Sequence, residues 1–161
     1  MSQLVNIVVC VSEQTLSLKK GSQLIKKYHV NTAKNGLGER NGSECTPRGQ
    51  HIIRAKIGGD APLNSVFAGR RPTGEIFDVG LAKKHPKRDW ILTRILWLSG
   101  VEKGMNRLGD VDTMRRFIYI HGAPDELITT DPTSHGCIRM GNLDVLDLFE
   151  RVPVYTPVLI K

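Results

Sequence analysis

Short runs of β-branched and aliphatic residues, separated by turn signals, constrain the fold of this chain most strongly. One run covers residues 4–11, and looser apolar alternation follows at 15–18 and 24–30, with a Lys-Lys-Gly turn at 19–21. Strands at such short spacing pair as hairpins. Further strand-like segments lie at 51–57, 90–98, 117–120 and 157–160. For 90–98 the periodicity alone does not exclude a helix. The pattern predicts a mainly β fold.

The clearest helix signal follows these strands, at residues 142–151. Apolar side chains recur along one face from Leu143 to Phe149, Asn142 is a suitable N-cap, and Pro153 stops the helix. With one or two helices, the expected architecture is an antiparallel, β-sandwich-like fold.

Size and charge limit the domain count and the partners. The 161 residues contain no repeat or linker, so residues 1–161 are expected to form one domain. The net charge of +7 favours anionic partners, but the basic residues are scattered and aromatic residues make up only 6%. That is too few for a base-stacking surface, so nucleic acid is not expected as a partner. No apolar run approaches the roughly 20 residues of a membrane helix, so membrane is not expected either.

The first residues of the sequence bear on location. Residues 1–11 have no basic start and no cleavage signature, and they read as a first strand rather than a secretory leader. The sequence therefore predicts a cytoplasmic protein.

Three cysteines, Cys10, Cys45 and Cys137, lie far apart in the chain. An odd count at long spacing is not typical of a disulfide framework, and no Cys-x-x-Cys pair suggests a structural zinc site. Cys10 and Cys45 are expected to be small apolar residues. Cys137 differs, because it lies in a polar, glycine-containing segment next to His135.

This segment, Ser134-His135-Gly136-Cys137-Ile138-Arg139-Met140, follows a strand that ends in His121-Gly122, and His121 and Cys137 are 16 positions apart. A cysteine becomes a strong nucleophile when an imidazole takes its proton. Gly136 permits an unusual turn whose N–H groups can converge on an oxyanion. Zinc binding by His121, His135 and Cys137 is the alternative, but the spacing chelates poorly and no acidic fourth ligand lies nearby. Neither a metal nor another cofactor is expected.

The His121-Gly122 pair and the segment from Ser134 to Met140 together resemble the signature of the L,D-transpeptidase catalytic domain family of the YkuD type. Thr46-Pro47-Arg48-Gly49 is similar to that family's Thr-Pro-x-Gly turn, and the His-to-Cys spacing is at the short end of the family range. The resemblance covers most of the chain. It implies a β-sandwich-like fold with a helix after the nucleophile, and a cysteine acyl-transferase that acts on peptidoglycan stem peptides or muropeptides.

The resemblance also implies roles for single residues. Cys137 matches the nucleophile and His121 its general base, with the carbonyl of Gly122 orienting the imidazole. His135 and Gly136 match residues that line the site.

The resemblance implies roles for four further groups near the nucleophile. The N–H groups of Gly136 and Cys137 are the expected oxyanion donors, and Ser134 is expected to structure the loop. Arg139 either contacts a substrate carboxylate or supports the loop.

The region 58–112 is less familiar and is expected to form a lid over the substrate. Trp90, Arg94 and Trp97 in this region are candidates for substrate contact, although core packing is expected for both aromatic residues.

The implied reaction leaves the acceptor open. The thiolate attacks the L,D bond before the terminal D-Ala, and the thioester is resolved by water or by an amine of another stem. A chain without a leader meets soluble peptides, so the expectation is an L,D-carboxypeptidase that serves peptidoglycan recycling, with transpeptidation or D-amino acid exchange as the alternative. A non-enzymatic muropeptide-binding domain and a redox-sensing thiol, which would need a resolving cysteine, are the competing classes.

Overall fold

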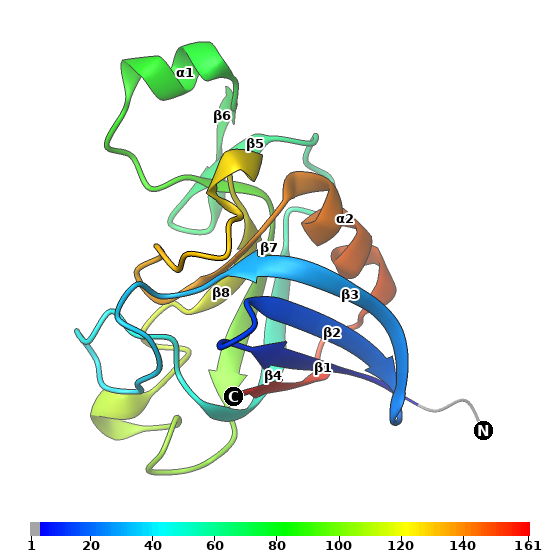
Figure 1. Cartoon of the computed structure of the whole chain (residues 1–161). Helices are drawn as coiled ribbons and strands as arrows, with labels where there is room; N and C mark the ends of the chain where they lie inside the picture. Colours follow the sequence, from blue (N-terminus) through cyan, green and yellow to red (C-terminus); the bar gives the residue numbers. More distant parts are fainter. Residues whose placement is uncertain (1–3) are drawn as a thin grey trace.

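A computed structural model of the protein describes residues 4–161, and the mainly β prediction is confirmed. Eight strands close into a barrel in the order β4-β10-β1-β2-β3-β9-β8-β7, because β4 pairs with both β10 and β7 (Figure 1). Hairpin β5–β6 extends from β7 outside the barrel. The strands are β1 (Val5–Cys10), β2 (Thr15–Lys20), β3 (Gln23–Asn31), β4 (Gly49–Ile57), β5 (Ser65–Ala68), β6 (Arg71–Ile76), β7 (Ile91–Gly100), β8 (Tyr119–Gly122), β9 (Ile138–Met140) and β10 (Pro157–Ile160).

The sheet is mixed, whereas the sequence predicted an antiparallel, sandwich-like arrangement. β1 pairs in parallel with β10, and β8 pairs in parallel with β9. Hairpin signals are local and reveal only antiparallel neighbours, while a parallel pair joins segments that a long connection separates. Insertion of the C-terminal β10 between β1 and β4 links the two ends of the sheet and closes it into a barrel.

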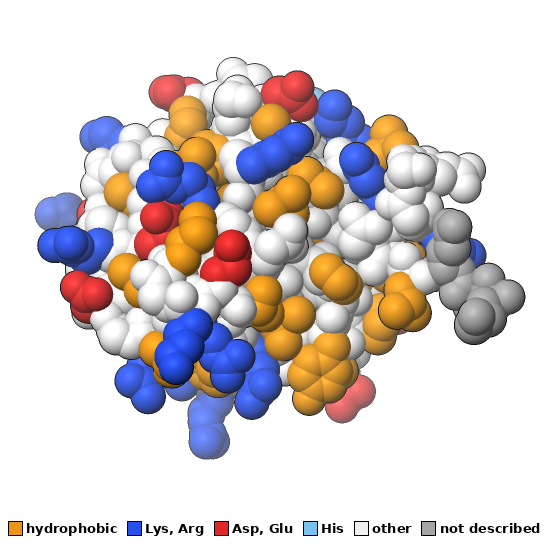
Figure 2. Space-filling view, turned by 90° about the horizontal axis from the view of Figure 1, so that it is seen from below, with side chains coloured by type: hydrophobic (Ala, Val, Ile, Leu, Met, Phe, Trp, Pro, Cys, Tyr) orange, Lys and Arg blue, Asp and Glu red, His pale blue; other side chains and the backbone are white. Residues whose placement is uncertain are grey.

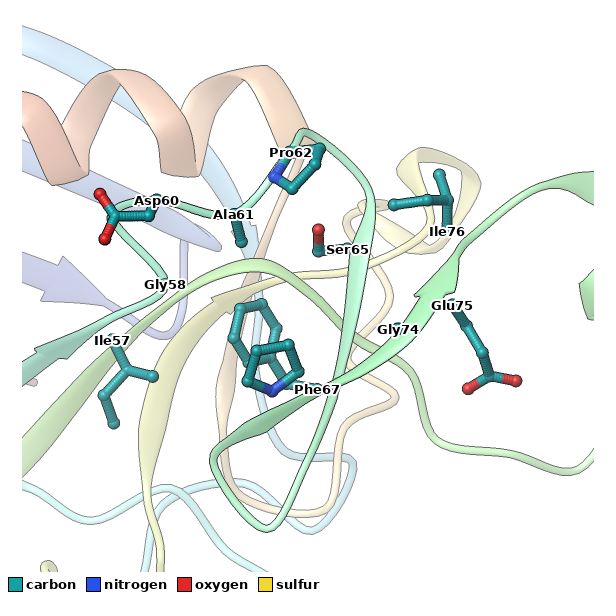
Figure 3. A pocket seen from close by; sticks show the side chains of 12 residues that line it. Ile57, Gly58, Asp60, Ala61, Pro62, Ser65, Phe67, Gly74, Glu75 and Ile76 are labelled. Atoms are coloured by element: carbon teal, nitrogen blue, oxygen red, sulfur yellow. The ribbon is translucent and has the colours of Figure 1, made fainter.

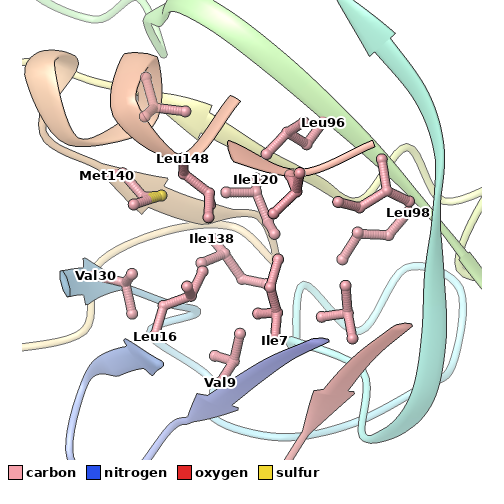
Figure 4. Close-up of a cluster of buried hydrophobic side chains, with 14 of the residues drawn as sticks. Ile7, Val9, Leu16, Val30, Leu96, Leu98, Ile120, Ile138, Met140 and Leu148 are labelled. Carbon is pink, nitrogen blue, oxygen red and sulfur yellow. The ribbon is translucent and has the colours of Figure 1, made fainter. Parts of the chain in front are cut away.

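The core fills the barrel and the space beneath one helix (Figure 4). The helix α2 (Asn142–Arg151) lies where it was predicted, directly after the strand that follows the nucleophile, and ends two residues before Pro153. Val145 and Leu148 have no exposed surface and pack with the barrel side chains. The core cluster includes Ile7, Val9, Leu16, Val30, Leu96, Leu98, Ile120, Ile138 and Met140.

Asn142 was expected to be the N-cap of α2, but Gly141 occupies that position. The Asn142 side chain is buried and instead joins three elements, donating to Ala123 O at 2.9 Å and accepting from Thr93 Oγ1 at 2.6 Å. Its backbone N–H donates to the Asp125 carboxylate at 2.9 Å. The residue therefore fixes α2 to β7 and to the end of β8.

An arm made of β5, β6 and α1 (Val79–Lys84) projects from the barrel at the top of Figure 1. The sequence did not predict α1, which has six residues, none of them buried. Asp78 caps its N-terminus, and the Asp78 carboxylate accepts from Leu81 N at 2.7 Å. Trp90 anchors the arm, because it is 6% exposed and packs with Val66 and Leu92. The expected core role of Trp90 is thus confirmed.

The surface carries its charge in small groups. Figure 2 shows one face on which Lys and Arg side chains lie in separate groups among apolar and neutral ones. Between residues 4 and 161, no helix has the length and apolar character to span a bilayer.

A buried histidine ties β4 to the loop before β8 and makes stability depend on pH. The His51 ring is 1% exposed and contacts Gly49 O at 3.0 Å and Thr113 Oγ1 at 2.9 Å. Burial lowers the pKa of His51 to about 4. The unfolded chain, with a His pKa of about 6.5, therefore takes up a proton first as the pH falls.

We predict that this difference lowers the free energy of unfolding by about 3 kcal/mol between pH 6.5 and pH 4, with no further loss below that window. Urea unfolding of wild type and His51→Gln across this range tests it, and the variant should show the flatter profile. His29→Gln, on an exposed residue, is the matched control. Parallel profiles for wild type and His51→Gln would contradict the prediction.

Candidate active site

The parallel pairing of β8 with β9 assembles the site. His121 lies opposite Arg139, and Cys137 directly precedes β9 next to Tyr119. Because side chains alternate along a strand, Tyr119, His121, Cys137 and Arg139 share one face of the sheet. The neighbouring Ile120 and Ile138 point into the barrel core. The candidate residues therefore lie on the outer face of the barrel, where Phe67 from the β5–β6 hairpin joins the same apolar cluster as Tyr119 and Cys137.

The Cys137 thiol is held by two backbone groups of the segment that leads into β8. Tyr119 N donates to Cys137 Sγ at 3.4 Å, and Cys137 Sγ donates to Phe117 O at 3.4 Å. Phe117 has a φ of 56°, a left-handed conformation that is unusual for a bulky residue. This strained residue is thus in direct contact with the candidate nucleophile, as is common at functional sites.

His121 has the orientation that a general base requires. Its ring is 2% exposed, and Nδ1 donates to Gly122 O at 2.7 Å, as expected. In the neutral ring this leaves Nε2 as the proton acceptor. In the described part of the chain neither His121 nor His135 forms a hydrogen bond with Cys137 Sγ. Catalytic hydrogen bonds often shorten only when substrate binds.

The residue after His121 has to be glycine. A Cβ atom on Gly122 would lie 2.5 Å from Leu92 O and 2.8 Å from Asn142 Oδ1. Close approach of β7 and α2 at this position therefore keeps the His-Gly pair of the motif together.

The nucleophile turn depends on Gly136 and Ser134. Gly136 has a φ of 131°, and a Cβ there would meet Ile118 Cδ1 at 3.1 Å and Cys45 O at 3.2 Å. Ser134 Oγ donates to Cys137 O at 2.7 Å and accepts from Gly136 N at 3.2 Å. Ser134 therefore structures the loop, as expected. The Gly136 N–H, expected to be an oxyanion donor, is instead engaged by Ser134, which leaves the Cys137 N–H as the candidate donor.

The Thr-Pro-Arg-Gly turn supports the nucleophile turn through Thr46. This side chain has no exposed surface, and Oγ1 donates to Gly136 O at 2.9 Å while accepting from Ala33 N at 3.1 Å. Arg116 braces the same region, donating to Cys45 O at 2.7 Å. The Cys45 thiol contacts Asn35 O at 3.5 Å, and only its carbonyl approaches Gly136.

Asp89, which sequence reasoning missed, connects the arm to the site. Its carboxylate pairs with Arg139 at 2.8 Å and with His135 Nδ1 at 3.5 Å. Arg139 also donates to Thr133 Oγ1 at 3.1 Å, so its guanidinium supports the loop, one of its two expected roles. His135 lies on the rim of the site with 63% of its side chain exposed. No sequence signal distinguished Asp89 from the charged loop around it.

Burial affects the charge of both candidate catalytic groups. It raises the pKa of the Cys137 thiol to about 11, although the Tyr119 N–H, Arg139 and Arg116 act in the opposite direction. It also lowers the pKa of His121. Burial of both groups therefore favours the neutral thiol and the neutral imidazole over the thiolate–imidazolium pair in the resting site.

A cavity of about 470 Å³ lies between the loop after β4 and the β5–β6 hairpin (Figure 3). Apolar residues line its centre, and Asp60 and Glu75 lie on opposite sides. Phe67 lines the cavity and also belongs to the cluster that contains Cys137, so the cavity adjoins the candidate site.

Two of the expected lid contacts have structural partners. Trp97 is half-buried and donates from Nε1 to Met114 O at 3.1 Å. Arg94 is 6% exposed and donates to Ala61 O at 2.8 Å. No group of three or more His, Cys, Asp or Glu side chains suited to a metal ion is found over residues 4–161.

Comparison with known proteins gave one family match and several structural matches. Residues 5–160 match the family described as the L,D-transpeptidase catalytic domain, YkuD. An L,D-transpeptidase from Xylanimonas cellulosilytica is similar in structure, with 17% identity and a TM-score of 0.58, over 100% of this chain and 62% of that one. One from Mycobacterium smegmatis has 17% identity and a TM-score of 0.56, over 98% and 58%. L,D-transpeptidase 3 from Mycobacterium tuberculosis, solved with a faropenem-derived adduct, has 15% identity and a TM-score of 0.58, over 98% and 60%.

These likenesses concern the fold, and this chain spans about three-fifths of the solved chains that it resembles. A search of curated proteins found no match.

We predict that Thr46→Val loosens the nucleophile turn, because it leaves Gly136 O and Ala33 N without their buried partner. The free energy of unfolding should fall by about 2 kcal/mol, measured by urea denaturation. Thr130→Val makes the same change on an exposed side chain and should stay within about 0.5 kcal/mol of wild type. Equal effects of the two substitutions would argue against a structural role for the Thr46 hydroxyl.

The neutral resting pair predicts a distinctive pH dependence for the alkylation of Cys137. Its rate with iodoacetamide should keep rising beyond pH 9, above the range of a free thiol with a pKa of about 8.5. Peptide mapping by mass spectrometry isolates the Cys137 rate, and Cys137→Ala provides the blank. A plateau at neutral pH would mean that alkylation does not depend on free ionisation of the thiol, and it would contradict the prediction.

Proposed function

The chain belongs to the L,D-transpeptidase catalytic domain family of cysteine acyl-enzymes, and we propose that it cleaves peptidoglycan tetrapeptide stems at the L,D bond before the terminal D-Ala. One observation carries this proposal. Cys137 directly precedes β9 and lies on the same sheet face as His121 of β8, whose Nδ1 donates to Gly122 O and whose Nε2 is left to accept a proton.

The proposed chemistry has two steps on one sulfur atom. As Cys137 Sγ attacks the scissile carbonyl, His121 Nε2 takes the thiol proton, and the Cys137 N–H donates to the oxyanion. The C–N bond then breaks, D-Ala leaves with the proton from His121, and a thioester remains. Because burial disfavours both charged forms, the transfer from sulfur to imidazole is coupled to bond formation.

Water is the proposed acceptor in the second step, in which it attacks the thioester carbonyl while His121 Nε2 takes its proton. The C–S bond then breaks, the sulfur regains a proton from His121, and the tripeptide leaves with a free carboxylate, which makes the protein an L,D-carboxypeptidase. The segment between His121 and Ser134 is short and tied to the barrel, since Asn31 Nδ2 donates to Asp131 O at 2.8 Å and to Thr129 O at 3.2 Å. Such a segment adds little surface for a second peptide. The 470 Å³ cavity beside Phe67 favours the other candidate, transpeptidation or exchange, because an amine acceptor needs a binding site of its own.

The partner and the location complete the proposal. A net charge of +7 suits stem peptides that carry several carboxylates. Peptidoglycan recycling in the cytoplasm is the proposed setting, and immunoblotting of fractionated cells tests it.

We predict that purified protein converts the tetrapeptide to tripeptide and free D-Ala, with no cross-linked dimer, when products are followed by mass spectrometry. A dimer as the major product would establish transpeptidation and overturn the choice of water. An unchanged tetrapeptide that nevertheless binds would point to a muropeptide-binding domain.

Variants assign the chemistry in the same assay. Cys137→Ala should abolish turnover, while the Cys10→Ala/Cys45→Ala double variant should remain active. His121→Ala should reduce the rate by about 10²–10⁴-fold as expected for a general base. His135→Ala, on the exposed rim, should reduce it by much less. Turnover by Cys137→Ala, or a larger loss at His135 than at His121, would overturn the assignments.

A further inference from the structure

The arginines around Cys137 differ in what their guanidinium groups contact. Arg139 pairs with Asp89, while Arg116 and Arg94 donate to the backbone carbonyls of Cys45 and Ala61. Like Arg94 and Arg116, Arg70 belongs to none of the ion pairs within residues 4–161, but unlike them it has no backbone carbonyl as a side-chain partner in that range. One of its five N–H groups donates to Tyr119 Oη at 3.1 Å, and no other side-chain hydrogen bond of Arg70 is present in the described residues.

The tip of the β5–β6 hairpin holds Arg70 in place. Gly69 and Arg70 have φ values of 54° and 65°, the left-handed conformations of a tight hairpin turn. Such a conformation is unfavourable for a residue with a side chain. The turn therefore accepts a conformational cost at Arg70 and directs its side chain back toward the barrel, where it meets Tyr119.

Two aromatic rings form a platform for this guanidinium. The Arg70 Cζ atom lies 4.7 Å from the ring centroid of Trp97 and 5.0 Å from that of Phe117. The platform is partly open, because Phe117 is 51% exposed and both Trp97 and Arg70 are half-buried. The cation–π contacts hold the guanidinium without using its N–H groups, which remain available to an anion.

The platform is connected directly to the nucleophile. Tyr119, whose hydroxyl accepts from Arg70, donates its backbone N–H to Cys137 Sγ, and the carbonyl of Phe117 accepts from the same sulfur. Tyr119 and Phe117 therefore both position Arg70 and hold the thiol.

We propose that Arg70 binds the free carboxylate of the terminal residue of the donor peptide, the residue that leaves when Cys137 is acylated. This inference rests on the proposed function. One extended residue spans roughly 3.5 Å, so that carboxylate lies within a few ångströms of the carbonyl under attack. A guanidinium suits a carboxylate because its planar N–H groups match the two oxygens. Arg139, the arginine that the sequence offered for this contact, is already paired with Asp89.

The test uses two alkylating probes that differ only in this carboxylate, N-iodoacetyl-D-alanine and N-iodoacetyl-D-alaninamide. In both, Cys137 Sγ forms a bond to the iodine-bearing methylene carbon as the C–I bond breaks, iodide and the thiol proton are released, and peptide mapping gives the Cys137 rate. Arg70→Gln should lower the acid-to-amide rate ratio by about tenfold, the effect of losing one charge-assisted hydrogen bond. The rate with the amide should stay within twofold of wild type, which shows that the thiol environment is intact.

The adjacent Arg71 provides the matched control. It is exposed and forms no ion pair within the described chain, so Arg71→Gln removes the same charge one residue away. Its acid-to-amide ratio should change by less than twofold. A ratio unchanged in Arg70→Gln, or reduced equally in both variants, would overturn the proposal, since the second result means a general effect of surface charge.

Peptide assays separate this inference from the proposed function and identify the carboxylate. Arg70→Gln should raise the KM for the tetrapeptide but leave cleavage of the terminal carboxamide analogue unchanged. An equal loss with both peptides would overturn the assignment to the terminal carboxylate. If no tetrapeptide is cleaved while the probe ratio still falls, the proposed function fails and the carboxylate site at Arg70 stands.

Discussion

The parallel pairing of β8 with β9 is the contact on which the rest of the site depends. Ile120 lies opposite Ile138, and neither has exposed surface, so burial of these side chains fixes the register. A slip of β9 by one residue would move Cys137 and Arg139 to the opposite face from His121. The apolar core of the barrel therefore determines the geometry of a polar site on its outer surface.

Buried polar groups then give the nucleophile turn a single conformation. The hydroxyls of Thr46 and Ser134 hold the turn, bonding to the Gly136 carbonyl, the Gly136 N–H and the Cys137 carbonyl. Each bond has a definite direction, whereas apolar packing has none. A network of this kind specifies a conformation when its members are satisfied. In this turn the satisfied network also removes one N–H group from the set available to an oxyanion.

The three arginines around the site differ in the groups that their guanidinium groups contact. Arg139 neutralises Asp89 and joins the arm to the nucleophile loop, Arg116 braces a loop through carbonyl groups, and Arg70 stacks on aromatic rings. The net charge of the chain does not distinguish these uses. Local partners do, because a guanidinium that already has a carboxylate or several carbonyls has few donors left for a ligand.

The sequence by itself determined the N-terminal hairpins and the helix after the nucleophile, because these depend on local periodicity. It also identified His121 and Cys137 as the candidate catalytic pair, because both lie in short motifs. Barrel closure, the role of Asp89, the capture of the Gly136 N–H by Ser134 and the position of Arg70 came only from the tertiary structure. Asp89 and Arg70 lie in segments whose composition is that of ordinary solvated loops. Their partners are 50 and 49 positions away in the chain, and no local pattern records a contact that forms only when the barrel closes.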